Sequence, residues 1–82
     1  MTPQRFDTIA TLQPIPAHRF QLSELSLAPL PRGQVGTIVE IYTTQTDPHY
    51  LIEFSDRQGR AYALVTLQSQ EFLLLHYDLA AA

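Results

Sequence analysis

The stretch "LPRGQVGTIVEIY", residues 30–42, decides the fold. Two glycines lead into an unbroken run of strand-forming residues, so residues 35–44 are predicted to form a strand. A glycine pair also suggests a phosphate-binding loop, which needs several amides that converge at a helix N-terminus. Here the glycines precede a strand, and their G-x-x-G spacing fits neither common phosphate fingerprint. We therefore predict a turn at Gly33 and a bulge or close backbone approach at Gly36.

Further strands are predicted on both sides of this stretch. Asp47-Pro48 marks a turn, and residues 50–56 and 60–67 read as strands joined by a hairpin at Gly59. Residues 68–72 suggest one 3-10 turn before a last short strand at 73–77. Upstream, residues 5–12 favour a strand, and the prolines indicate one long loop over 14–32.

This order of elements is typical of an all-β fold, a small SH3-like barrel. We expect about five antiparallel strands, a long first loop and one 3-10 turn. The chain of 82 residues forms a single domain over 1–82, with loose termini at 1–4 and 79–82. Simple alternation over 35–42 places Val35, Thr37, Val39 and Ile41 on one face of their strand. The predicted core contains Ile38, Val39, Ile41, Ile52, Phe54, Leu64, Leu67 and Leu74.

Composition excludes several classes of protein. The absence of cysteine rules out disulfides and cysteine-based zinc sites. The net charge is −3, with five arginines and no lysine, and the pI is near 5.4. Non-specific nucleic-acid binding needs several cationic contacts, so this balance disfavours it. The sequence carries neither a signal-peptide pattern nor an apolar run of membrane-spanning length, and we expect a cytoplasmic protein without membrane contact.

Three segments carry a resemblance to a known family. "LPRGQVGTIVEIY", "YLIEFSDRQGRAYALVTL" and "LLLHY" resemble small bacterial proteins catalogued as a domain of unknown function, which share an Arg-Gly-x-x-Gly-Thr-Ile-Val-Glu signature. In general form the first segment also looks like the glycine-bearing hairpin strand of KOW-type modules. The resemblance covers residues 6–77, although the segment before Arg32 is longer than in that pattern. It implies association with toxin-like genes, and hence an immunity or antitoxin role.

Residues that could carry catalysis are not arranged for it. His18, His49 and His76 lack the short, repeated spacing of a metal site. Glu40 and Glu53 lie on strands predicted to pair, where two close carboxylates could act as acid and base if burial raised one pKa. The alternative is that both face solvent and pair with arginines at 57 or 60. We expect no enzyme, no cofactor and no metal.

Tyrosines and arginines suggest a binding surface instead, because both residue types are enriched at protein interfaces. The alternative is that the tyrosines sit at the edge of the core with their hydroxyls in water. The long loop carries more apolar side chains than a solvated loop needs. We predict that the partner-binding residues are Phe20, Leu22, Leu25, Arg32 and Tyr62. The predicted function is a protein-binding module, an accessory, antitoxin or immunity protein that contacts another protein or its own copy; the alternative is a KOW-like nucleic-acid-binding barrel.

Overall fold

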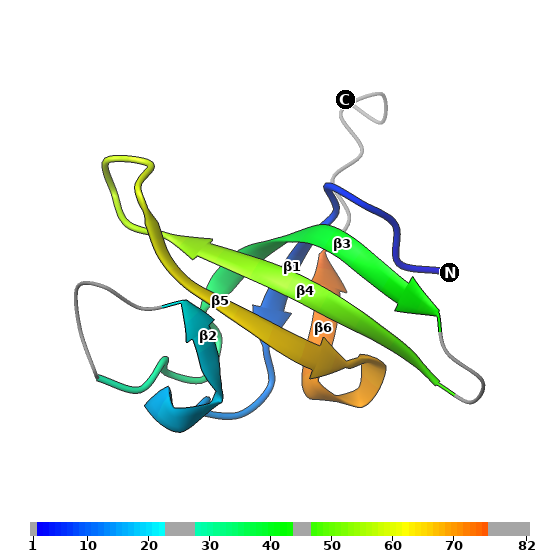
Figure 1. Ribbon diagram of the computed structural model, residues 1–82, viewed down its shortest axis with the longest axis horizontal. Coiled ribbons are helices and arrows are strands. Elements are labelled where there is room, and N and C mark those ends of the chain that lie inside the picture. Colours follow the sequence, from blue (N-terminus) through cyan, green and yellow to red (C-terminus); the bar gives the residue numbers. More distant parts are fainter. Residues whose placement is uncertain (1, 23–27, 44–46, 76–82) are drawn as a thin grey trace.

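The computed structural model describes residues 2–22, 28–43 and 47–75. Within these ranges, two 3-10 turns, η1 (Ala17–Arg19) and η2 (Ser69–Glu71), directly precede the second and the sixth strands (Figure 1). The all-β class is confirmed. The six strands are β1 (Thr8–Thr11), β2 (Phe20–Leu22), β3 (Val35–Thr43), β4 (Pro48–Ser55), β5 (Ala61–Gln68) and β6 (Phe72–Leu75).

The strands form one antiparallel sheet in the order β2-β5-β4-β3-β1-β6. In Figure 1, β4 and β5 run diagonally across the molecule, whereas β1 and β6 are steeply inclined to them. Among the described residues, β2 pairs only with β5 and β6 only with β1, so the hydrogen-bonded order is open. The expected closed barrel is therefore corrected to an open sheet that bends around its core.

The long loop expected over 14–32 is also corrected. It contains η1 and β2, so the described residues form six strands and two 3-10 turns instead of the expected five and one. Phe20 pairs with Val65 and Leu22 with Leu64, so β2 covers the backbone edge that β5 would otherwise expose. The prolines lie before and after β2 and do not interrupt it.

The core lies between β4–β5 and the β1–β6 pair. Tyr50 on β4 meets Phe72 on β6 edge to face, with ring centroids 5.3 Å apart. Of the predicted core, Ile38, Ile52, Phe54 and Leu67 are buried, and the other four side chains are half-buried. The buried hydrophobic residues that the prediction missed are Ile9, Ile15, Leu30, Tyr50, Ala63, Val65 and Phe72.

A bulge at Val39 explains why simple alternation along β3 was wrong. Ile38 pairs with Ile52 and Glu40 with Leu51, which leaves Val39 as an extra residue. An extra residue reverses the side-chain alternation, so Ile38 before it is buried and Ile41 after it also packs against the core.

Gly36 makes the close approach that the sequence predicted. A Cβ added there would lie 2.7 Å from Cε1 of Phe54 and 2.8 Å from Cγ2 of Ile52. Gly33 and Gly59 have φ values of 82° and 81°, so the predicted turns at both positions are confirmed. Within the described part of the chain, neither helical turn has the length and apolar character needed to cross a membrane.

Candidate functional site

A surface cleft of about 200 Å³ lies where residues 12–34, the first segment, meet the β4–β5 hairpin. Its floor is formed by Leu30 and Phe54, which are 4% and 1% exposed. Exposed prolines at 29 and 31 form one rim, and the end of β4 with Tyr62 forms the other. We call this feature the loop cleft; its lining residues are Pro29, Leu30, Pro31, Gln34, Phe54, Ser55, Asp56 and Tyr62.

Two backbone hydrogen bonds bring the ends of the first segment together beneath the cleft. The Ile15 N–H donates to the Leu30 carbonyl, and the Leu30 N–H donates to the Ile15 carbonyl, each at 2.9 Å. Both side chains are buried in the core. Apolar burial and a two-bond bridge therefore hold the proline-containing wall in place.

Thr11, at the end of β1, fixes the turn beside this wall. Its buried hydroxyl donates to the Pro31 carbonyl at 2.8 Å and accepts from the Gln34 N–H at 2.9 Å. Its carbonyl accepts from the Gly33 N–H at 2.7 Å. These bonds hold Arg32 exposed at the apex of a turn.

The opposite wall depends on a second bulge. Phe54 pairs with Ala63 and Ser55 with Ala61, so Tyr62 is the extra residue on β5. Bulges commonly redirect a side chain next to a functional site. The Tyr62 ring is half-buried and meets Phe20 of β2 edge to face, with centroids 6.4 Å apart.

The structure thus joins part of the predicted binding set. Phe20 and Tyr62 are in contact, and Arg32 directly follows Pro31 of the cleft wall. Leu22 lies in β2, whereas Leu25 falls outside the described residues. Sequence reasoning missed the two prolines as parts of this surface and Thr11 as the buried residue that supports it. The prolines on both sides of Leu30 were the available signal, because such residues stiffen a loop.

The carboxylate of Asp56 at the rim already accepts hydrogen bonds within its own hairpin. Its carboxylate accepts from the N–H groups of Gln58 and Arg60 at 2.9 and 3.0 Å, and from Arg60 Nε at 2.9 Å. These hydrogen bonds, chiefly that from the Arg60 backbone amide, lower the pKa of Asp56. The cleft therefore presents mainly apolar surface, and the Asp56 carboxylate at its rim stabilises the hairpin turn.

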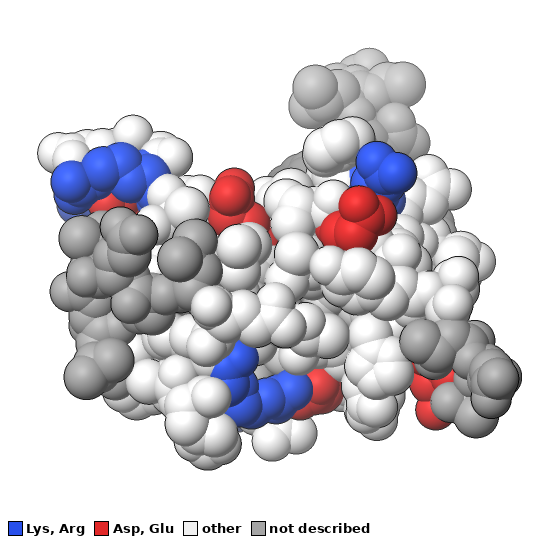
Figure 2. Space-filling model, viewed as in Figure 1, with Lys and Arg blue, Asp and Glu red and all other residues white. Residues whose placement is uncertain are grey.

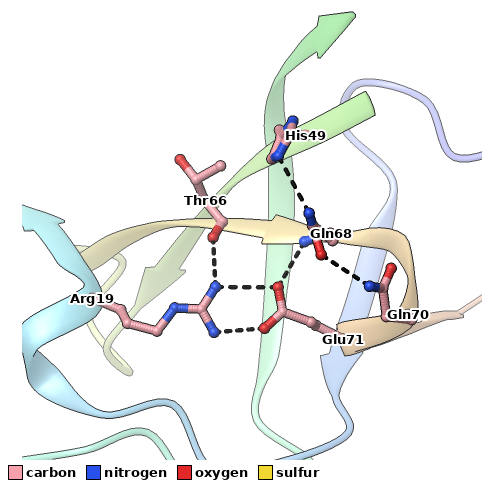
Figure 3. A network of polar contacts seen from close by, with 6 residues as sticks. All are labelled: Arg19, His49, Thr66, Gln68, Gln70 and Glu71. Carbon is pink, nitrogen blue, oxygen red and sulfur yellow. Dashed lines mark hydrogen bonds and ion pairs between the residues drawn. The ribbon is translucent and has the colours of Figure 1, made fainter. Parts of the chain in front are cut away.

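A second cluster of polar side chains joins η1 to η2 (Figure 3). Arg19 donates from Nη1 to Oε2 of Glu71 at 2.5 Å and from Nη2 to Oε1 of Glu71 at 3.1 Å. Its Nη2 also donates to the Thr66 carbonyl at 3.1 Å. Glu71 in turn accepts from the Gln68 N–H at 2.8 Å, which caps η2. The network therefore ties the first segment to the turn before β6.

The protonation states of this network suit a structural role. The hydrogen bond from Arg19 is the main cause that lowers the pKa of Glu71, and the same bond raises the pKa of Arg19. A general acid or base at neutral pH needs a carboxyl pKa raised toward 7. Glu71 is shifted in the opposite direction and stays an ionised acceptor.

The other acids and histidines are dispersed. Glu53 pairs across the sheet with Thr37, and Glu40 with Leu51, so the two carboxylates are not directly opposite. Oε1 of Glu40 lies 3.4 Å from Nε of Arg5. The alternative was that the two carboxylates pair with Arg57 or Arg60; for Glu40 and Arg60 it is wrong, because Glu40 lies beside Arg5 and Arg60 binds Asp56.

No three metal-ligating side chains come together in residues 2–22, 28–43 and 47–75. His18 is exposed in η1, and His49 lies 3.5 Å from the Gln68 amide. His76 falls outside the described part of the chain.

The family model for Domain of unknown function (DUF4926) matches residues 5–74. The chain belongs to this family. Comparison with the curated proteins and with the solved structures gives no match. The matched range of the DUF4926 domain contains the whole loop cleft, both bulges and the Arg19–Glu71 pair. The cleft and its supports therefore lie within the part of the chain that the family model describes.

Proposed function

We propose that this DUF4926 protein is a non-catalytic protein-binding module whose contact face is the loop cleft with its flanking residues. The observation that carries the proposal is an apolar floor, Leu30 and Phe54, framed by exposed prolines and Tyr62. An accessory subunit, an antitoxin and an immunity protein all act through such a contact. The flanking residues that the structure describes beside the cleft are Phe20 and Arg32. From the sequence, we propose that Leu22 and Leu25 also contact the partner.

The size and chemistry of the cleft favour a side chain of a partner over a small-molecule ligand. Cofactor and drug-sized sites usually enclose about 300–1,000 Å³, whereas the loop cleft has about 200 Å³. Asp56 is occupied by the hairpin amides and Arg60. A partner would place one or two apolar side chains between the prolines and Tyr62.

Preorganisation supports the same function. The Ile15–Leu30 bridge and the hydrogen bonds of Thr11 fix the wall of the cleft before any partner arrives. A rigid surface loses less conformational entropy on binding, which leaves more of the contact energy as affinity.

The fold also supports a binding role. We infer that the sheet is an open form of the SH3-like barrel, with β3, β4 and β5 as the meander, β1 and β6 beside it, and η2 before the last strand. The first segment corresponds to the long first loop of that fold. Through β2, the first segment pairs with β5 and forms the sheet edge opposite β6.

The charge distribution argues against the KOW-like nucleic-acid alternative. Arg5, Arg19 and Arg60 each pair with a carboxylate. On the face in Figure 2, the basic groups lie in separate places, and red carboxylate atoms lie close to them. A phosphate backbone needs a continuous basic surface. We place the protein in the cytoplasm, in keeping with its sequence.

Two tyrosines provide a matched test. Tyr62 lines the loop cleft, whereas Tyr42 is 46% exposed near the end of β3 and outside the cleft. Partners would be captured from the native host on immobilised wild-type protein, identified, and then measured against purified Tyr62→Ser and Tyr42→Ser proteins. We expect Tyr62→Ser to weaken binding at least about tenfold, as loss of an interface tyrosine commonly does. Tyr42→Ser should bind like wild type.

Three outcomes would contradict the proposal. Equal affinity of the wild-type protein and the Tyr62→Ser variant would place the contact elsewhere. Equal losses in the two serine variants would point to a stability effect. Salt-sensitive binding of the wild-type protein to a random oligonucleotide, without a protein partner, would favour the nucleic-acid alternative.

A further inference from the structure

Within residues 2–22, 28–43 and 47–75, the edge strand β6 lacks the usual protection of a sheet edge. It pairs with β1 over four consecutive residues without a register shift and ends the strand order of the described sheet. Its sequence, FLLL, contains no charge and no proline. Soluble proteins normally protect an edge with lysine, proline, a bulge or a covering segment, because unpaired backbone groups recruit another strand.

The register identifies which backbone groups face outward. The Leu12 N–H donates to the Glu71 carbonyl at 3.1 Å, directly before the pairing of Thr11 with Phe72. In an antiparallel ladder, alternate pairs exchange hydrogen bonds. Leu73 and Leu75 therefore direct their amides toward β1, and Phe72 and Leu74 direct theirs toward the open edge.

The outer face of this edge is apolar. Leu73 is 54% exposed and lies opposite Ala10, which pairs on its other side with Val35. Val35 is 50% exposed, so a short apolar row crosses β3, β1 and β6 and ends at the open edge. Phe72 and Leu74 pack inward on the core.

We propose that β6 is a dimerisation edge, on which a second copy of this chain pairs its own β6 in antiparallel fashion. A two-fold axis at Leu73 places Phe72 of each copy opposite Leu74 of the other. In that register, the outward N–H and C=O groups of both residues are paired. The two Leu73 side chains then face one another in a non-hydrogen-bonded pair, where Cα atoms are only about 4.5 Å apart.

A second copy suits this edge for two physical reasons. The outward N–H and C=O groups lie symmetrically on either side of Leu73, so those of one copy match those of an identical second copy, as a two-fold interface requires. Because β6 contains no charged residue, pairing with a second copy brings no like charges of the two strands together. The neighbouring carboxylate of Glu71 is already bound by Arg19. The edge is distinct from the loop cleft, so the proposal does not rest on the proposed function.

Leu73→Lys and Val35→Lys form a matched pair of variants. Both replace a half-exposed apolar residue of the same row, and only Leu73 lies on the open edge. Sedimentation equilibrium over a wide range of protein concentration should show a reversible dimer for the wild-type protein. Leu73→Lys places two like charges across the axis and should raise the dissociation constant at least about tenfold. Val35→Lys should remain within about threefold of the wild-type dissociation constant.

Hydrogen exchange on the wild-type protein tests the register without any substitution. The amides of Phe72 and Leu74 should exchange fast at low concentration and become protected as the dimer forms. The amides of Leu73 and Leu75 should be protected at all concentrations. A wild-type protein that stays monomeric, a dimer in which the Phe72 and Leu74 amides stay unprotected, or equal weakening by the two lysine variants would overturn the proposal.

Discussion

The meander formed by β3, β4 and β5 and the first segment, residues 12–34, are stabilised in different ways. The meander strands follow one another in the chain and bury a continuous apolar row that includes Ile52, Phe54 and Val65. Of the first-segment residues whose burial the structure describes, 12–21 and 28–34, only Ile15 and Leu30 are buried. It is held mainly by polar contacts with distant residues, such as the bonds of Arg19 to Glu71 and of Thr11 to Pro31.

This difference implies a hierarchy of stability. A region with few buried apolar contacts opens at a lower free energy than the central strands. The loop cleft lies between the two regions, with Leu30 from one and Phe54 from the other on its floor. Its shape should therefore be lost when the first segment opens, before the meander unfolds.

The largest effect is expected from removing the centre of the meander. Phe54 is 1% exposed, and Phe54→Ala should lower the free energy of unfolding by about 3–5 kcal/mol. Such a loss is comparable with the whole stability of a small domain, so both regions should unfold together. Urea denaturation followed by circular dichroism measures this change. Phe6→Ala, at a side chain that is 73% exposed, is the matched control; a Phe54→Ala protein as stable as that control would contradict the placement.

A smaller effect is expected where the backbone of β3 meets the same ring. Gly36→Ala would place a Cβ 2.7 Å from the buried Phe54 ring and should cost about 1–3 kcal/mol through overpacking. In a Phe54→Leu background, the added methyl group should cost less because the ring is gone. Additive losses in the double variant would contradict this steric account.

Loss of the polar contact at η2 should affect mainly the first segment. Glu71→Ala removes both the partner of Arg19 and the cap of Gln68, and should cost about 1–2 kcal/mol. Glu71→Gln keeps a capping oxygen and should cost less. Hydrogen exchange should show faster opening in residues 12–22 while the amides of β4 keep their protection. Equal acceleration in both regions would remove the distinction between them.

The smallest effect concerns pH. The bond from Arg19 lowers the pKa of Glu71 below its ordinary value of about 4.3. A lowered folded-state pKa adds stability that is present above the unfolded-state pKa and lost as pH falls through the folded-state pKa. Stability should therefore fall below about pH 4.3, and less steeply in Glu71→Gln. Asp56 acts in the same direction in both proteins, so the difference between their denaturation midpoints isolates Glu71. Identical pH profiles would contradict the assigned role.

The sequence by itself determined the meander, the turns and the class of fold. Strand formation follows from β-branched and alternating residues, and the turns follow from the glycines at 33 and 59, which adopt positive φ values without steric cost. Both signals are local, because they depend on residues a few positions apart. Gly36 was also recognised, since a glycine inside a strand signals a bulge or a close approach.

Only the tertiary structure decided the bulges, the pairing of β2 and the composition of the loop cleft. The extra residues Val39 and Tyr62 depend on how two strands align, which a single strand's pattern does not contain. Arg19 and Glu71 are 52 positions apart in the sequence, so no local spacing predicts their contact. Tyr62 and Arg32 were predicted as binding residues from their types, whereas the role of Thr11 and the place of the prolines in the cleft wall became visible only once the chain was folded. The reason is physical: a cleft is formed by side chains that folding brings together, and its walls come from segments that are remote in the chain.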